Sequence, residues 1–546
     1  MKRPTRETHY TKRHLRDTYY IVGEGTVYYD PKGKPTTDPD GGGDVPAMRK
    51  FRFSRMGPKG EAIPANVISG LADAMTANGG PDSAGPTIPA GFTYLGQFID
   101  HDLTKDITAT ALGNTVTIDD LIQGRSPALD LDCMYGRGPD DAEDSKFYSD
   151  GIRIKMGKTA PVPFPDGGTN VPLDGFDLPR VGQGPTKLEK RAALIPDHRN
   201  DENLVVAQTH LAMIRFHNRV VNHIAPTTPT TDLFNRAREL TVKHYQWMIK
   251  TDFLPRIVDN AIVQDVFTNG RKFFEKDATP ADMPTMPIEF SVAAYRLGHS
   301  MIRSAYQWNR VFRAGGPGNI ATLLLLFQFS GTSGILSIDG DLNDRESGSF
   351  EQLPTNWVAD FRRLYDFTEA GRADLTPPEG APNVTKKIDT LLVDPLKTLP
   401  HGSFGGSAAT PPAELNLAFR NLQRANMVEL ATGQQMATLM NVPPLTAAQL
   451  TQGLPATLSS VGTKAPLWYY ILREAELNNG KLTGVGGRIV AETFHRAMEG
   501  SAHSIVRDPA FRPTALVQNT NDRFNMTDLL LFAFEGNAAL LNPLGD

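Results

Sequence analysis

The chain has 546 residues, a formal net charge of −5 and 40% hydrophobic residues, which is ordinary for a globular protein. This mildly acidic balance gives no reason to expect nucleic acid or an anionic membrane as a partner. The single cysteine, Cys133, excludes a disulfide framework within the chain. The basic start is not followed by an apolar segment, and residues 323–327, the longest apolar run, are too few to span a bilayer. We therefore expect a soluble protein without a membrane span, either cytoplasmic or exported without a Sec-type signal peptide.

The first part of the chain is rich in Gly, Pro, Asp and Lys, with glycine breaks at residues 41–43 and 57–60. This composition predicts that residues 1–85 form an irregular N-terminal arm with short elements at most, packed on the core. Residues 137–190 look similar, and the prolines at 161, 163 and 165 cannot belong to a helix. Residues 86–546 are expected to form one large domain.

Helical periodicity is clearest in residues 203–224, where apolar residues recur at spacings of three, four and seven. A second helix is predicted over residues 232–253, begun by Asp232 as N-cap and ended by Pro255. Further candidates are residues 288–304, 412–432, 465–479 and 487–498. Strand signals are few and short. The sequence thus predicts a mainly α-helical single domain with long irregular loops and very little β structure.

A histidine between two aspartates is the first candidate for chemistry. Gln97 and His101 are four residues apart and share a face if this segment is helical, while Asp100 and Asp102 flank the histidine. A His-Asp pair can hold a metal, as in His-Asp phosphohydrolases, or the histidine can shuttle a proton. A polar, solvent-facing stretch of helix fits the same spacing.

Residues 95–103 resemble the distal-histidine helix of the animal-type haem peroxidases, the peroxidase–cyclooxygenase superfamily. This family includes myeloperoxidase, lactoperoxidase and peroxidasin and has bacterial members, and we expect this chain to be one of the latter. The resemblance implies a haem cofactor, either haem b or an ester-linked derivative. It also implies that His101 moves the proton of hydrogen peroxide and that Gln97 binds distal water or an anion.

The same family places a calcium loop after the distal helix, ending in a Tyr-Gly pair like Tyr135-Gly136. Calcium takes six to eight hard oxygen ligands. Alternate residues of one loop supply such oxygens, from the side chains or, at Ala128, the carbonyl: Ser126, Ala128, Asp130 and Asp132. By resemblance Asp102 completes the site, and Asp132 stands where better-known members have serine. An acidic surface loop is the simpler interpretation of the same residues.

The next matching segment begins at Asp197, just before the strongest helix. The resemblance makes Arg199 the distal arginine, whose fixed positive charge would stabilise the oxygen that leaves when the peroxide bond breaks. It also matches Asp100 and Glu202 to two carboxylates that form ester bonds to haem methyl groups in mammalian members. Asn203 occupies the position of the methionine that forms a sulfonium link in myeloperoxidase, so that link is not expected.

On the proximal side, residues 296–300 resemble the family's Arg-x-x-His element, in which the histidine binds the haem iron. The resemblance implies that His299 is this ligand and that Asn421 hydrogen-bonds its second nitrogen, which tunes the basicity of the imidazole. Arg424 would pair with a haem propionate, although the residues after it depart from the family pattern. Cyclooxygenases and related dioxygenases have a radical tyrosine three residues before the proximal histidine; here Arg296 stands there, as in peroxidases. Tyr295 would face about 100° away on an α-helix.

These matches occur in the family's order across about residues 85–430. They imply a peroxide-dependent haem peroxidase that oxidises bromide, iodide, thiocyanate or phenolic donors. Three alternatives stay open: a haem-dependent fatty-acid dioxygenase on the same scaffold, a metal-dependent His-Asp hydrolase, and a non-catalytic haem-retaining adhesion protein. Fold analogy alone does not identify the electron donor.

Overall fold

A computed structural model describes residues 28–29, 35–36, 51–77, 88–108, 110–121, 123–162, 171–279, 282, 284–516 and 522–546. The architecture is mainly α-helical, as predicted. The longer helices, of seven residues or more, are α2 (Ala65–Met75), α3 (Gly91–Leu103), α6 (Leu204–Ile224), α7 (Thr230–Met248), α9 (Asn260–Asn269), α12 (Leu417–Met427), α13 (Gly433–Leu439), α15 (Leu467–Leu477), α16 (Gly484–Gly500) and α17 (Met526–Ala533).

Shorter α-helices connect or flank these: α4 (Asp132–Tyr135), α5 (Lys187–Arg191), α8 (Leu254–Ile257), α10 (Gly298–Met301), α11 (Leu323–Gln328), α14 (Ala447–Thr451) and α18 (Ala538–Leu541). The strands of the described residues pair only in twos. They are β1 (Tyr28–Tyr29) with β2 (Pro35–Thr36), β3 (Phe53–Ser54) with β6 (Met286–Pro287), β4 (Gly157–Lys158) with β5 (Asp174–Asp177), and β7 (Ala305–Tyr306) with β8 (Ala321–Thr322). The β3–β6 pair is parallel and the other three are antiparallel.

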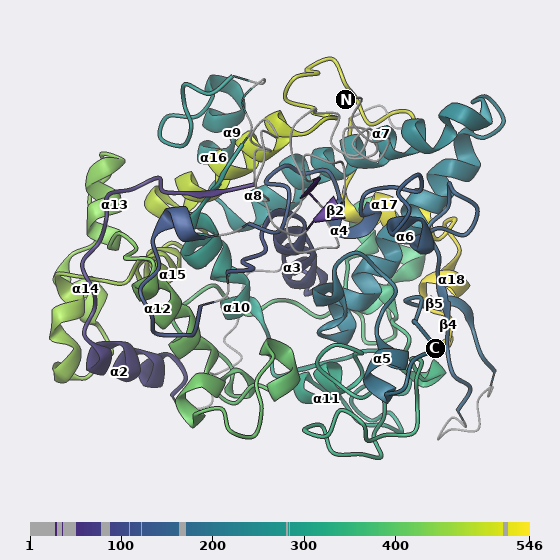
Figure 1. The fold of residues 1–546 in the computed structure, drawn as a ribbon, viewed down its shortest axis with the longest axis horizontal. Helices are drawn as coiled ribbons and strands as arrows, with labels where there is room; N and C mark the ends of the chain where they lie inside the picture. Colours follow the sequence, from purple (N-terminus) through teal and green to yellow (C-terminus); the bar gives the residue numbers. More distant parts are fainter. Residues whose placement is uncertain are drawn as a thin grey trace.

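Helix α3 lies near the middle of the molecule (Figure 1). On one side of it are α12, α13, α14 and α15, and on the other are α6, α7 and α17. It packs against α6, α4 and α10, and its apolar residues Leu95, Phe98, Ile99 and Leu103 are fully buried. The helix that carries His101 is therefore a central element of the core.

Helix α6 matches its predicted range. Its N-cap is Asn203, whose side chain accepts a hydrogen bond from the backbone N–H of Val206 at 2.9 Å. Helix α7 begins at Thr230, two residues before Asp232. Pro255 does not end the helical path, because after a π-helical segment (η4, Ile249–Phe253) it lies in the first turn of α8, where its missing N–H costs no hydrogen bond.

The predicted helix over residues 288–304 is three segments of different winding. A π-helix (η5, Glu289–Ala293) is followed by a 3-10 turn (η6, Ala294–Leu297) and then by α10. The α-helical angle per residue therefore does not apply across Tyr295, Arg296 and His299. The other predicted helices appear as α12 after a 3-10 turn (η13, Pro412–Leu415), α15 and α16.

The predicted N-terminal arm lies largely outside the described residues, but residues 51–77 of it are described. They include β3 and α2, which is longer than the short elements expected there. Five apolar residues of α2 are buried, at the spacings of an amphipathic helix: Val67, Ile68, Leu71, Ala72 and Met75.

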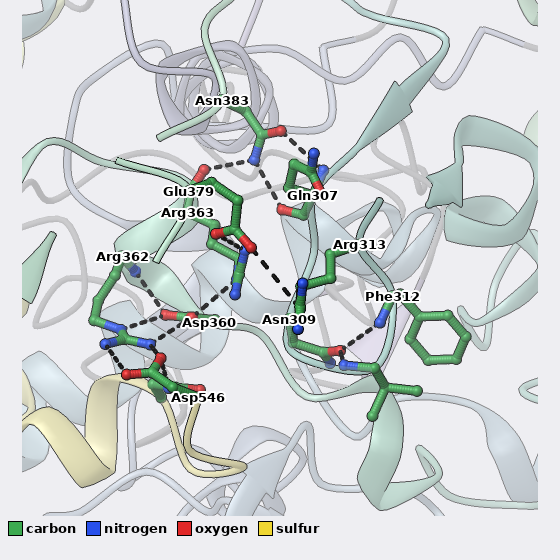
Figure 2. Close-up of polar contacts among 12 residues, drawn as sticks. Gln307, Asn309, Phe312, Arg313, Asp360, Arg362, Arg363, Glu379, Asn383 and Asp546 are labelled. Carbon is green, nitrogen blue, oxygen red and sulfur yellow. Dashed lines mark hydrogen bonds and ion pairs between the residues drawn. The ribbon is translucent and has the colours of Figure 1, made fainter. Parts of the chain in front are cut away.

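A polar network joins the end of the described chain to residues 360–383 (Figure 2). Asp360 accepts hydrogen bonds from Arg362 at 3.0 Å and Arg363 at 3.1 Å. Arg362 also pairs with Asp546, and Arg363 pairs with Glu379. These ion pairs hold long irregular segments in place. No helix of the described ranges combines the length and apolar character needed to cross a membrane.

Candidate functional site

A cavity beside α3 is lined by six of the nine residues predicted for the haem site. Together with the part that is open to solvent, its empty space is about 990 Å³. Its polar wall consists of Gln97, Asp100, His101, Glu202, Asn203, Arg296 and His299. The remaining wall is largely apolar, with Phe92, Phe327, Leu396, Leu399 and Leu417 among its residues. Segments far apart in the sequence therefore meet around one space of mixed polarity.

His101 is buried, with 4% of its surface exposed. Its Nδ1 lies 2.8 Å from Oδ1 of Asn200, and its Nε2 lies 3.3 Å from Oε1 of Glu202. Gln97, one turn earlier on α3, donates a hydrogen bond to the same Glu202 oxygen at 3.1 Å. Asn203 in turn donates to Oε1 of Gln97 at 2.9 Å. Nδ1 of His101 thus has a hydrogen-bond partner and Nε2 faces a carboxylate, and both groups come from residues that just precede α6.

Arg199 lies beside this group and is not among the residues lining the cavity. It belongs to a 3-10 turn (η3, His198–Asp201) and donates to Asp197 and to the backbone carbonyl of His101, the latter at 3.1 Å. Arg125 donates to the same Asp197 carboxylate at 2.7 Å. These two guanidinium groups, with Lys105, hold the pKa of Asp197 well below its usual value despite its burial. The structure places Arg199 at the end of α3, in an ion-pair cluster behind the cavity wall.

His299 enters the cavity from α10. The side-chain amide of Asn421, on α12, lies 2.9 Å from its Nδ1. Burial, reinforced by the nearby charge of Arg296, lowers the pKa of His299 to about 3. The imidazole is therefore neutral near pH 7, the form in which a histidine binds a metal.

Arg296 and Tyr295 both line the cavity, which corrects the expectation that Tyr295 points away from the site. Tyr295 precedes His299 by four residues, a spacing that shares a face on a helix, and the winding changes from π-helical to 3-10 just before it. Tyr295 stacks on Phe290, with ring centroids 4.6 Å apart, and its buried hydroxyl has no hydrogen-bond partner among the described residues. Burial and the charge of Asp100 raise the pKa of Tyr295 well above its usual value.

Asp100 is held at the cavity by two contacts. Thr104 donates a hydrogen bond to its Oδ1 at 2.9 Å, and Arg296 lies 3.6 Å from its Oδ2. Arg296 also lines a second, smaller cavity of about 370 Å³, together with Arg424, Asp106 and Ser291. Arg424 pairs with Asp106 at 2.6 Å and does not line the main cavity. Two arginines thus face one small space next to the main cavity.

The predicted calcium ligands are buried together behind α3. Burial and the neighbouring carboxylates raise the pKa of Asp102 well above its usual value and that of Asp130 to about 6. Oδ1 of Asp102 and Oγ of Ser126 are buried without a hydrogen-bond partner among the described residues. Such oxygens suit a hard cation.

The side chains around this loop are not arranged as a ready metal site. Asp130 accepts a hydrogen bond from Ser501 and one from the backbone N–H of Ala502, and the Ala128 carbonyl accepts one from the backbone of Asp130. No group of three or more His, Cys, Asp or Glu side chains in the described ranges is placed to hold a metal. The chemistry of the donors fits a cation, and their geometry fits it only in part.

Sequence reasoning missed several residues of the site. Asn200 lies between two predicted residues, Arg199 and Glu202, and carries no motif of its own. Thr104, Asp106 and Ser291 carry no motif, and only their contacts reveal them. One signal was present for Thr104, which follows Asp100 by four residues and so shares its face of a helix.

Comparisons with known proteins find similarity to animal haem peroxidases. The family model for animal haem peroxidase matches residues 110–321. A peroxidase-like protein of Margaritifera margaritifera is 28% identical over 234 residues, which cover 39% of this chain and 27% of that protein. A chorion peroxidase of Aedes aegypti is 23% identical over 197 residues, which cover 33% of this chain and 22% of that protein. The matched region thus spans about a quarter of the length of these curated relatives.

Solved structures share the fold over nearly the whole chain. Peroxidase A of Dictyostelium discoideum aligns with a TM-score of 0.53 and 13% identity, covering 92% of this chain and 96% of that one. The fatty acid α-dioxygenase of Arabidopsis thaliana aligns with a TM-score of 0.57 and 12% identity, covering 98% and 85%. At such identities the likeness concerns the fold alone.

Proposed function

We propose that this relative of the animal haem peroxidases is itself a hydrogen-peroxide-dependent haem peroxidase. The observation that carries the proposal is that His101, Gln97, Glu202, Arg296 and His299 line one cavity. One histidine that can bind iron, a second histidine with hydrogen-bonding neighbours, and apolar walls suit a haem peroxidase site. Haem, when bound, would supply an iron that reduces hydrogen peroxide and then takes electrons from a donor.

His299 would hold the haem iron through Nε2, with its Nδ1 directed to Asn421. A hydrogen bond at the second nitrogen fixes the ring and tunes its basicity. The small cavity with Arg296 and Arg424 would receive the haem propionates, because a guanidinium group binds a carboxylate strongly. Arg424 would then exchange or share its contact with Asp106.

His101 would act as the acid–base residue. Its Nε2 would accept a proton from hydrogen peroxide and would return that proton to the oxygen that departs as water. Gln97 would hydrogen-bond water or an anion beside His101. The positive charge of Arg199, at the end of α3, would stabilise the oxygen that leaves when the peroxide bond breaks. Asp100 and Glu202 line the cavity where ester bonds to haem would form.

We further propose a small electron donor, namely bromide, iodide, thiocyanate or a phenol. We also propose a calcium ion bound by Asp102, Ser126, Ala128, Asp130 and Asp132. The two buried oxygens without hydrogen-bond partners support the calcium proposal. Calcium there would require Asp130 to turn from Ser501, and it would stiffen the end of α3 that carries His101.

Replacing His101 tests the mechanism. We expect His101→Ala to bind haem normally and to react with hydrogen peroxide about 100-fold or more slowly than the wild type, because the proton acceptor is lost. Stopped-flow absorbance of the haem band measures this rate. Wild-type kinetics in His101→Ala would overturn the proposed role.

A haem-dependent fatty-acid dioxygenase is the second candidate. It is favoured by Tyr295, an oxidisable side chain in the cavity wall, and by the apolar residues of the same cavity. Oxygen uptake on addition of a fatty acid, without peroxide, would support this alternative; peroxide-dependent oxidation of iodide or a phenol without such uptake would exclude it.

A further inference from the structure

The 3-10 turn η3 holds His101 from three sides. Asn200 contacts the ring at Nδ1, Arg199 donates to the backbone carbonyl of His101, and Glu202, the C-cap of η3, faces Nε2. Asn200 is fully buried, so its side chain cannot exchange this contact for bulk water. Asp197 fixes the start of the turn by accepting the backbone N–H of Arg199 at 3.0 Å.

We propose that Asn200 is a positioning residue that keeps a proton on Nδ1 of His101 and thereby directs proton exchange to Nε2. An amide oxygen accepts hydrogen bonds and cannot donate them. With Oδ1 of Asn200 at 2.8 Å, Nδ1 must carry a hydrogen whether the ring is neutral or charged. The proton that comes and goes is then the one at Nε2, on the side of Glu202 and the cavity. This inference rests on the proposed function, in which peroxide gives its proton to that nitrogen.

The other polar groups around His101 have other partners or do not contact Nδ1, so Asn200 is the group that accepts its hydrogen bond. On α3 itself, Asp100 is engaged by Thr104 and Arg296, and Asp102 accepts the backbone N–H of Leu131. From α6, His210 faces the same region, but neither of its ring nitrogens has a hydrogen-bond partner among the described residues. Arg125 and Asp197 neutralise each other behind the ring.

The proposal depends on which end of the Asn200 amide faces Nδ1 of His101. If the amide were turned, its Nδ2 would donate to Nδ1 and the single proton of a neutral ring would move to Nε2, which would then be unable to accept one from peroxide. Nδ2 of Asn200 is buried and has no hydrogen-bond partner within the part of the chain that the structure describes. An aspartate at this position can only accept, whereas a leucine of similar shape can neither accept nor donate.

The experiment compares Asn200→Leu and Asn200→Asp with the wild-type holoenzyme. We expect Asn200→Leu to bind haem but to react with hydrogen peroxide at least about tenfold more slowly, since the ring is no longer held in one tautomer. Asn200→Asp should restore the rate to within a few-fold of wild type. The carbon–oxygen stretching frequency of the ferrous carbon monoxide complex is a second readout. It should differ from wild type in Asn200→Leu and return towards it in Asn200→Asp.

Asn218→Leu is the matched control. This asparagine is also buried, but its two hydrogen bonds are with the backbone of Ile154, and it does not line the cavity. It should lower stability without changing the rate or the stretching frequency. If Asn200→Leu does not fold, Asn200→Ala is a second variant that lacks the amide group.

Three outcomes would overturn the proposal: wild-type behaviour of both removal variants, an Asn200→Asp protein as slow as Asn200→Leu, or an equal loss of rate in Asn218→Leu. Failure of the proposed function itself is distinguishable. In that case the wild type does not react with peroxide at all, while the stretching frequencies still report whether Asn200 orients His101.

Discussion

We propose that two carboxylate side chains decide whether haem would be held covalently. Asp100 and Glu202 both line the cavity, and each is already fixed by hydrogen bonds, Asp100 through Thr104 and Glu202 through Gln97. Carboxylates that are held in this way can be presented to the edge of a bound ring.

We therefore expect haem of the wild type, after turnover with peroxide, to resist extraction by acid–acetone. Asp100→Asn combined with Glu202→Gln should release it, because an amide cannot form the ester. The absorbance of the extract measures the released haem. A control with Asp106→Asn, whose carboxylate contacts Arg424 outside the main cavity, should keep the haem attached. Complete extraction from the wild type would exclude the ester bonds.

Residues that were named from a short motif lie together in the structure. Gln97, Asp100, His101, Glu202, Arg296 and His299 were all named from short runs, and all line the cavity. Two features could not be read from a motif. Asn200, which contacts the ring of His101, has no motif of its own, and the direction of Arg199 depends on its ion pair with Asp197, two residues earlier.

At the scale of elements, one buried carboxylate joins two helices. Glu474, on α15, accepts hydrogen bonds from the backbone N–H groups of Val485 and Gly486 in the first turn of α16. It replaces the side-chain cap that Thr483 does not provide. Burial raises the pKa of Glu474 to about 7, above its usual value of 4.5.

This shift makes a prediction about pH. Because the folded protein binds the proton of Glu474 more tightly than the unfolded chain, this group's stabilisation is complete below about pH 4.5 and is lost as the pH rises through about 7. Glu474→Gln cannot ionise. The wild type should therefore lose thermal stability relative to this variant as the pH rises from 5 to 8. The melting temperature of the variant minus that of the wild type should increase over this range. A constant difference over that range would contradict the raised pKa.

Element boundaries show what local patterns can and cannot predict. The period of α6 is uniform, so its range was predictable from apolar spacing. Residues 289–301 have the same apolar character but change winding twice, because the segment must direct both Tyr295 and His299 into one cavity. A period-based argument cannot detect such changes, and the predicted direction of Tyr295 was therefore wrong.

At the scale of the whole molecule, residues 51–63 connect the two segments that hold His299 and Asn421. Glu289, in the π-helix before His299, accepts the backbone N–H groups of Met56 and Gly57, each at 2.9 Å. Arg55 donates to two backbone carbonyls just after α12, and β3 pairs with β6. We propose that this part of the chain is packed on the core as a clamp on the proximal side.

We expect Glu289→Leu to lower the free energy of unfolding by about 2 kcal/mol or more, since two buried backbone donors lose their acceptor. The loss should be accompanied by weaker haem binding, measured by haem titration. Glu61→Gln is the control, because Glu61 belongs to the same segment but pairs with Lys464 at the surface. Haem affinity that is equal in both variants would contradict the clamp.

The central claim is that the cavity is a haem site with His299 as the iron ligand. The absorption spectrum of the haem-loaded protein tests it most directly, recorded for the wild type and for His299→Ala with and without added imidazole. The account predicts one haem per chain with a strong Soret band in the wild type. It also predicts a lost or shifted band in His299→Ala, and its recovery when imidazole fills the space left by the side chain. A wild-type spectrum in His299→Ala, or a wild type that takes up no haem, would contradict the account.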